Sequence, residues 1–170
     1  RCAECVLVGV ELELLLRFFR SGVLLGGGDQ LGDGVLDEGG GGAAFGGIQP
    51  QTLPFEADGT LDLTQVSTLI KPDDVHFAKT RLLCLENTTW GKILRLEYLK
   101  QARKFIDEHG LLLHLDGARI FNAVLASGIP VAEIAGYFDS VSVCLSKGLG
   151  APVGSLLLGK KDFIKQGKRW

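Results

Sequence analysis

Two stretches, LLLHLD at residues 111–116 and DSVSVCLS at residues 139–146, decide the fold class. Each is a short and nearly continuous apolar run, which is the pattern of a β-strand that is buried on both faces. Residues 120–126 between them have helical spacing and end before Gly128, a residue type that commonly terminates helices. A strand, a helix and a second strand in this order predict a parallel pair joined by a right-handed crossover.

The same alternation extends over the rest of the chain after residue 47. Apolar runs of strand length occur as RLLCLEN at 81–87 and SLLLG at 155–159, and helical spacing occurs in LEYLKQARKFIDEHG at 96–110. A further helix is expected to begin in KDFIKQGKR, and Asp62 is a candidate N-terminal cap for a short one. We therefore expect an α/β fold with three layers, in which helices cover both faces of a mainly parallel sheet.

The composition is typical of a soluble globular protein. Charged residues make up 22% of the chain and apolar residues 46%, and the formal net charge is −2. Without a basic run, there is no electrostatic basis for binding nucleic acid or an anionic membrane surface. The apolar N-terminal segment is interrupted by Glu11, Glu13 and Arg17, so it does not predict a membrane span. These features favour a cytoplasmic protein.

The four cysteines indicate neither a disulfide framework nor a metal site. Cys2 and Cys5 have the spacing of half a zinc site, but no second pair follows them. Cys84 and Cys144 lie inside apolar runs, where a thiol usually behaves as a small buried hydrophobic group. We expect a reducing compartment and no bound metal.

Glycine is concentrated in residues 26–47, which read GGGDQLGDGVLDEGGGGAAFGG. Such a composition raises the entropy lost on ordering, so we expect a flexible or poorly packed region. The alternative is a loop that cradles a phosphate, although the GxxxxGK[ST] pattern is missing. We divide the chain into a divergent region at residues 1–45 and an α/β domain at residues 46–170. The chain begins with Arg1 and has no methionine, so we expect a piece of a longer protein.

Three side chains of complementary chemistry follow the two strands quoted first. Asp116 ends one strand, Arg119 stands shortly after it, and Lys147 follows the end of the other strand. Ligands of open α/β sheets bind beyond the carboxyl ends of the strands, so parallel strands would bring the carboxylate and the amine to one edge. Pyridoxal phosphate needs such a pair, because a lysine forms a Schiff base with its aldehyde and an acid partners its pyridinium nitrogen. Arg119 could bind a carboxylate or a phosphate.

Each of these residues also has an ordinary structural interpretation. A strand-end aspartate such as Asp116 commonly caps a helix or a turn, while Lys147 and Arg119 taken singly are typical of a solvated surface. The run GLGAPVG after Lys147 also imitates a nucleotide-binding glycine loop, but no ribose-binding acid follows at the spacing of that motif. The cofactor hypothesis therefore depends on the three residues taken together.

The segments HLDGARIFNA at 114–123 and VSVCLSKGLGAPVGS at 141–155 resemble the threonine aldolase family. Shorter supporting stretches are DGTLDL, TRLLCLENT and LEYLKQARKFIDEHG, and the resemblance covers residues 46–167. It implies the aminotransferase-like fold of type I pyridoxal phosphate enzymes, with this chain as part of the large domain. It also implies cleavage of L-threonine or L-allo-threonine to glycine and acetaldehyde.

The resemblance further implies roles for individual residues. Lys147, in the SKGL motif, corresponds to the catalytic lysine that forms the Schiff base, and Asp116 corresponds to the partner of the pyridine nitrogen. Arg119 corresponds to an arginine at the substrate carboxylate or the cofactor edge, and Thr89 stands at a substrate-contacting position. Family members act on a small amino acid and assemble as homodimers or homotetramers.

Several parts of the family pattern are missing from this chain. Thr89 stands where the family usually has a histidine, and a threonine cannot act as a general base near neutral pH. The segment nearest to a cofactor-stacking histidine reads GDQLG at residues 28–32 and lacks that histidine. A Ser-Gly-Thr phosphate loop and a C-terminal carboxylate-binding arginine are also not found. We therefore expect a pyridoxal phosphate-dependent aldolase whose isolated chain is weak or inactive, and the alternative is a non-catalytic relic of such an enzyme.

Overall fold

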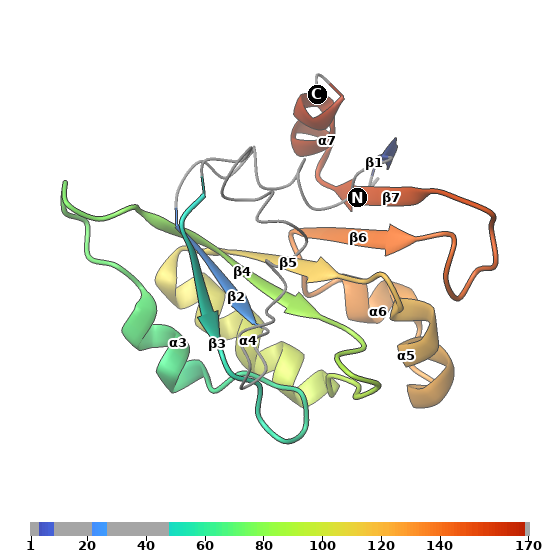
Figure 1. Ribbon diagram of the computed structural model, residues 1–170, viewed down its shortest axis with the longest axis horizontal. Helices are drawn as coiled ribbons and strands as arrows, with labels where there is room; N and C mark the ends of the chain where they lie inside the picture. The colour runs from blue at the N-terminus through green and yellow to red at the C-terminus, as the bar shows by residue number, and fades with distance from the viewer. Residues whose placement is uncertain (1–3, 9–21, 27–47, 169–170) are drawn as a thin grey trace.

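The computed structural model describes residues 4–8, 22–26 and 48–168 of the chain. Its strands, in chain order, are β1 (Glu4–Val8), β2 (Gly22–Gly26), β3 (Pro50–Leu53), β4 (Thr80–Glu86), β5 (Leu112–Asp116), β6 (Ser140–Cys144) and β7 (Ser155–Gly159). Its helices are α3 (Leu63–Leu69), α4 (Leu96–His109), α5 (Ile120–Ser127), α6 (Val131–Ala135) and α7 (Lys161–Gly167). Figure 1 shows these helices packed around one twisted sheet.

The sheet has seven strands in the order β1-β7-β6-β5-β4-β2-β3. Strands β3, β2, β4, β5 and β6 run parallel, whereas β7 is antiparallel to β6 and β1 is antiparallel to β7. The expected mainly parallel α/β sheet is therefore confirmed. The reversal at β7 follows from its connection, because residues 145–154 between β6 and β7 contain no helix that could carry the chain back across the sheet.

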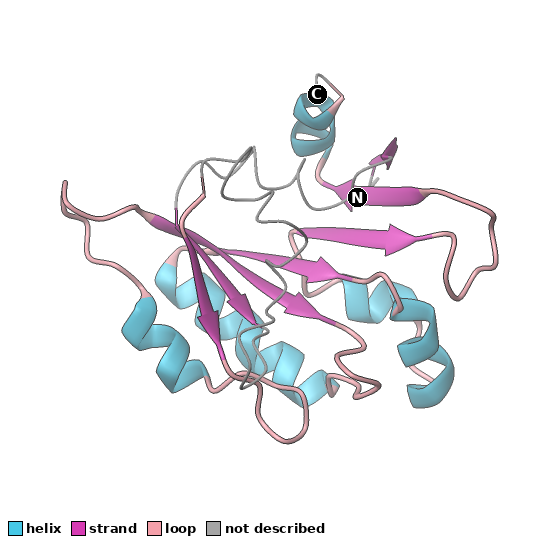
Figure 2. Ribbon diagram, in the orientation of Figure 1, coloured by secondary structure: helices cyan, strands magenta, loops and turns pink. Residues whose placement is uncertain are grey.

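One face of the sheet is covered by α3, α4, α5 and α6, which lie together beneath the strands in Figure 2. Alternate residues of β4, β5 and β6 point to this face and join the apolar sides of the helices in one buried cluster. The strand members are Leu83, Leu85, Leu113, Leu115, Val141 and Val143, and the helix members include Leu99, Ala102, Ile106, Ile120 and Ile134. Burial of each leucine, isoleucine or valine in this cluster stabilises the fold by about 1.5–3 kcal/mol relative to an exposed side chain.

The opposite face of the sheet carries a more polar set of buried side chains. Its members in the central strands are Cys84, His114, Ser140, Ser142 and Cys144. Helix α7 packs on this side, because Gly159 pairs with Ser140 in the register of β6 and β7, and a Cβ at Gly159 would lie 2.7 Å from the Phe163 ring. Helices therefore lie on both faces, as expected for three layers.

Three helix ends follow the sequence signals closely. Gly110 and Gly128 end α4 and α5 in the left-handed region, with φ of 63° and 69°. The side chain of Asp62 caps α3 by accepting a hydrogen bond from the Thr64 backbone N–H at 2.8 Å. These helix caps depend on residues close in sequence and need no tertiary contact, so the sequence is sufficient to predict them.

Strands β1 and β2 come from the N-terminal part of the chain. The sheet therefore takes strands from both sides of the boundary expected near residue 46, with β2 inserted between β3 and β4. Residues 27–47, which hold most of the glycine-rich segment and the expected phosphate-cradling alternative, lie outside the described residues. Within the described part of the chain, no helix is long and apolar enough to cross a membrane.

Candidate active site

Asp116 is the last residue of β5 and lies at the carboxyl edge of the sheet. In the strand register it stands between Glu86, the last residue of β4, and Ser142 of β6. The carboxyl is half-buried, and its Oδ1 accepts a hydrogen bond from the Ala118 backbone N–H at 2.9 Å. The strand end therefore fixes the direction of a carboxylate at the place where ligands of parallel sheets bind.

Gly117 lets the chain turn sharply after Asp116. Its N–H donates to the Ser142 carbonyl at 2.8 Å, and a Cβ at this position would lie 2.8 Å from the same oxygen. No larger residue fits there without displacing β6 or the start of α5. The sequence interpretation did not assign Gly117 to the site, although a glycine directly after a strand-end acid is the signal that could have found it.

Substituting Gly117 with alanine should destabilise the protein by about 1–3 kcal/mol, because the added methyl group overpacks a closed contact. Thermal or denaturant unfolding would measure the change. A suitable comparison is Gly128→Ala at the other end of α5, where the space is open and the cost comes from the left-handed φ alone. We expect Gly117→Ala, and not Gly128→Ala, to weaken pyridoxal phosphate capture as well. Equal capture by both variants would contradict a positioning role for Gly117.

Arg119 occupies the N-cap position of α5, with its backbone carbonyl accepting from the Asn122 N–H at 3.0 Å. The side chain is exposed, and among the described residues its guanidinium makes no hydrogen bond or ion pair. The backbone of Arg119 is thus fixed by the helix start, while its guanidinium is available at the edge of the sheet. Such an arrangement suits a residue that binds an anionic ligand group.

Lys147 lies in the loop that follows β6 and is exposed. Its backbone carbonyl accepts from the Gly150 N–H at 3.0 Å, so the loop turns back directly after the lysine. The loop passes close to α5, because a Cβ at Gly148 would lie 2.9 Å from Asn122 Oδ1. The loop directly after the lysine therefore lies next to the first turn of α5, whose N-cap is Arg119.

The electrostatics of Glu86 connect the three residues that the sequence predicts. Burial raises the pKa of the Glu86 carboxyl, and the neighbouring Asp116 raises it further, whereas Arg119 and Lys147 act in the opposite direction. Asp116, Arg119 and Lys147 thus all lie within electrostatic range of the Glu86 carboxyl. Glu86 itself was missed from the sequence, since it reads as the end of an ordinary buried strand.

Thr89 follows the end of β4 and adds no charge to this cluster. Only 1% of the residue is exposed, and its hydroxyl donates to the Glu86 backbone carbonyl at 2.9 Å. Its backbone pairs with Lys92 in a tight turn in which Trp90 and Gly91 both have positive φ. The hydroxyl is therefore committed to the local backbone and is not presented to a ligand.

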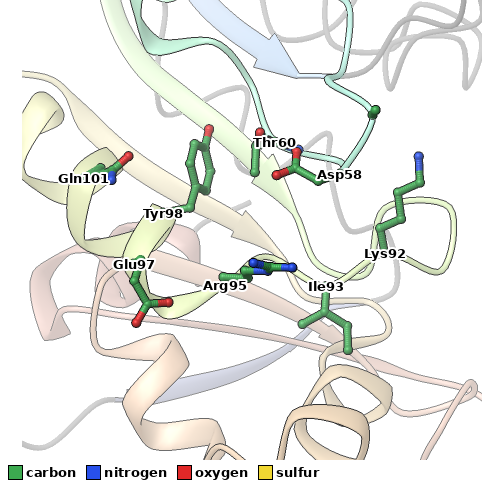
Figure 3. A pocket seen from close by; sticks show the side chains of 9 residues that line it. Asp58, Thr60, Lys92, Ile93, Arg95, Glu97, Tyr98 and Gln101 are labelled. Atoms are coloured by element: carbon green, nitrogen blue, oxygen red, sulfur yellow. Dashed lines mark hydrogen bonds between the residues drawn. The ribbon is translucent and has the colours of Figure 1, made fainter.

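The described residues also form a cavity of about 540 Å³ that is separate from the cluster of charges. Figure 3 shows that its side chains come from the start of α4, the loop before it and the segment before α3. The lining residues are Ala57, Asp58, Thr60, Lys92, Ile93, Arg95, Glu97, Tyr98 and Gln101. Because none of the candidate residues lines it, the chemistry of the strand edge and not this cavity identifies the site.

The residues at the strand edge fit pyridoxal phosphate in chemical type. Lys147 offers an accessible amine for an aldehyde, Asp116 a carboxylate for a cationic ring nitrogen, and Arg119 a guanidinium for an anionic group. Asn87, the residue after Glu86, is fully buried, and its backbone N–H donates to the Asp116 carbonyl at 3.0 Å. This bond ties the ends of β4 and β5 together beside the predicted site.

The sequence is similar to proteins of one known family. The sequence model of the beta-eliminating lyase family matches residues 21–170. The low specificity L-threonine aldolase of Escherichia coli (strain K12) is 57% identical over 141 residues, covering 83% of this chain and 42% of that protein. The probable low-specificity L-threonine aldolase 2 of Arabidopsis thaliana is 46% identical over 138 residues, covering 78% and 39%. The chain therefore spans about two fifths of the length of these curated relatives.

Solved structures share the fold. A putative L-allo-threonine aldolase from Listeria monocytogenes superposes with a TM-score of 0.78 at 27% identity, over 98% of this chain and 46% of that one. Leishmania major threonine aldolase gives a TM-score of 0.79 at 24% identity, over 98% and 52%. An aspartate aminotransferase from Thermus thermophilus, at 14% identity and a TM-score of 0.68, matches in fold alone. The expected architecture of a type I pyridoxal phosphate enzyme is thereby confirmed.

Proposed function

Because the chain belongs to the beta-eliminating lyase family and its relatives include threonine aldolases, we propose that it is the part of a pyridoxal phosphate-dependent aldolase that carries the cofactor lysine. The resemblance read from the sequence is confirmed at the level of the family. The proposed reaction is the cleavage of L-threonine or L-allo-threonine to glycine and acetaldehyde. Its substrate is a small amino acid, and assembly into a homodimer or homotetramer stays a prediction.

One observation carries the proposal. Asp116 ends β5 and Lys147 follows β6, and these two strands are parallel neighbours in the sheet. A carboxylate and an amine therefore leave the same edge of the sheet, with Arg119 at the start of the helix that connects them. This edge is the side on which open α/β sheets bind their ligands, and an arbitrary pair of surface charges is not expected to lie together there.

The proposed roles follow from the chemistry of each group. Pyridoxal phosphate supplies an electron-accepting ring, which lets a bond at the α-carbon of the substrate break. Lys147 would hold the aldehyde of the cofactor through its amine, and Asp116 would keep a proton on the ring nitrogen. Arg119 would orient the carboxylate of the amino acid through paired N–H donors.

We propose weak or no turnover for the 170-residue chain by itself. The hydroxyl of Thr89 is committed to the Glu86 carbonyl, so it supplies no base for the β-hydroxyl group of a substrate. The chain also spans only about two fifths of the length of its curated relatives. The second candidate, a non-catalytic relic, is favoured by the same commitment of Thr89.

Chemical trapping separates the two candidates. The chain is incubated with pyridoxal phosphate, reduced with sodium borohydride, digested and analysed by mass spectrometry. The aldolase proposal expects one reduced pyridoxyl label on the peptide that contains Lys147. Labels spread over exposed lysines such as Lys160 and Lys161, with none at Lys147, would support the relic. Glycine released from L-threonine and from L-allo-threonine, measured on the same preparation, then reports turnover separately from cofactor capture.

A further inference from the structure

Glu86 and Asp116 form a pair of acids at the edge of the sheet. They end neighbouring parallel strands and stand opposite each other in the register of β4 and β5. Strand neighbours lie about 4.8 Å apart. The preceding apolar residues Leu85 and Leu115 belong to the cluster beneath the helices, so by strand alternation both acids point to the opposite, polar face.

The surroundings of the two carboxyls are unequal. Asp116 accepts the backbone N–H of Ala118 at 2.9 Å, a contact that favours its ionised form. The Glu86 carboxyl is half-buried, and no hydrogen bond or ion pair to it occurs among the described residues. Two neighbouring carboxylates disfavour each other's charge, so a shared proton goes to the acid whose anion is less well supported.

We infer that Glu86 and Asp116 act as a coupled acid pair in which Glu86 takes up the proton and Asp116 keeps the negative charge. Glu86 is then a positioning residue that acts through Asp116. When the pH falls, protonation of Glu86 leaves the Asp116 carboxylate ionised and removes the repulsion on it. The titration of the two acids can be measured in the protein alone. The use of the pair, which is to keep one negative charge opposite a cationic ring nitrogen, rests on the proposed function.

The other titratable groups near Glu86 are consistent with a proton on Glu86 and a negative charge on Asp116. Burial raises the pKa of Glu86, with Asp116 adding to the effect, while the cations Arg119 and Lys147 oppose it. Behind the pair, burial raises the pKa of the Cys84 thiol. Burial also lowers the pKa of His114 to about 3, so at neutral pH neither of these groups adds a charge. The pKa of Glu86 is therefore set first by burial, and then by one neighbouring anion and two cations.

The first test follows the side-chain carboxyl carbons by ¹³C NMR during a pH titration of the protein without cofactor. We expect the Glu86 signal, assigned with Glu86→Gln, to titrate at higher pH than the Asp116 signal. Asp116→Asn should move the Glu86 titration to lower pH, and Lys147→Gln should move it to higher pH. Glu97→Gln, at an exposed position on α4, should leave it unchanged. A Glu86 titration that ignores Asp116→Asn, or that occurs below that of Asp116, would overturn the inference.

The second test uses stability, and its sign follows from the raised pKa. An acid whose pKa is raised by folding contributes stability that is present below its ordinary value of 4.5 and is lost as the pH rises through the folded value. Glu86→Gln cannot titrate, so its free energy of unfolding relative to wild type should increase from about pH 4 upwards. Parallel pH profiles of the two proteins would contradict the inference.

The third test concerns the cofactor. Glu86→Gln imitates the protonated acid, so it should still capture pyridoxal phosphate at neutral pH, whereas Asp116→Asn should capture it more weakly. If wild type captures the cofactor and both variants lose capture equally, the different roles inferred for Glu86 and Asp116 are overturned. If wild type captures no cofactor, the proposed function fails, and the titrations without cofactor still decide whether the acid pair exists.

Discussion

Replacing Lys147 with alanine is expected to abolish the capture of pyridoxal phosphate by this chain. The methyl side chain removes the amine that would hold the aldehyde, and no other candidate residue at the strand edge carries a primary amine. The visible absorption band formed on adding cofactor should disappear. Any threonine cleavage should fall by about 10²–10⁴-fold, the range for loss of a positioned proton-transfer group.

Two further variants show what the lysine contributes. Lys147→Arg keeps a positive charge but has no nucleophilic amine, so it should lose the band as completely as alanine does. Lys160→Ala removes an exposed lysine that follows β7 and should keep the band. Because Lys147 is exposed, the alanine variant should unfold within about 0.5 kcal/mol of wild type. A band that persists in Lys147→Ala would place the aldehyde on another amine and refute the proposed anchor.

The parts of the fold that depend on local sequence could be predicted. The apolar strand runs, the glycine caps Gly110 and Gly128, and the aspartate cap at Asp62 all express preferences that act within a few residues. The strand–helix–strand order around Asp116 and Lys147 also predicts the parallel pair, because crossover connections of this length rarely produce any other arrangement.

Long-range pairing could not be predicted in the same way. Strand β2 inserts between β3 and β4, and no local pattern in GVLLG indicates which partners it finds. The reversal of β7 follows from the connection at residues 145–154, which contains no helix, and not from any pattern within SLLLG itself. Pattern reasoning identifies such strands more readily than their neighbours, because the register depends on the whole sheet.

Some residues of the candidate site could be predicted from the sequence, and others could not. Three residues stand out in the sequence because each lies at or shortly after the end of a recognisable strand, namely Asp116, Arg119 and Lys147. Glu86 does not, since only the register with Asp116 reveals that two acids share the edge. The hydrogen bond that occupies the Thr89 hydroxyl is equally hidden, because it depends on the turn geometry of the residues that follow.

The substitution Asp116→Asn is expected to separate the charge of the aspartate from its shape. The asparagine side chain keeps an oxygen that can accept the Ala118 N–H, so the turn after β5 should survive and stability should change little. Without a negative charge, the ring nitrogen of a bound cofactor loses the group that keeps it protonated. We expect any threonine cleavage to fall by about 10²–10³-fold, the range for removal of one preorganised electrostatic contact.

The substitution Asp116→Glu tests whether the negative charge itself is needed. Asp116→Glu restores the charge with a longer side chain, so it should recover part of the cofactor binding that asparagine loses. Binding is measured by titrating pyridoxal phosphate into each variant and following the visible band, with unfolding curves to verify the fold. The proposed role requires the asparagine variant to bind more weakly than the glutamate variant. Binding as tight as wild type in Asp116→Asn would show that Asp116 serves the turn after β5 and not the cofactor.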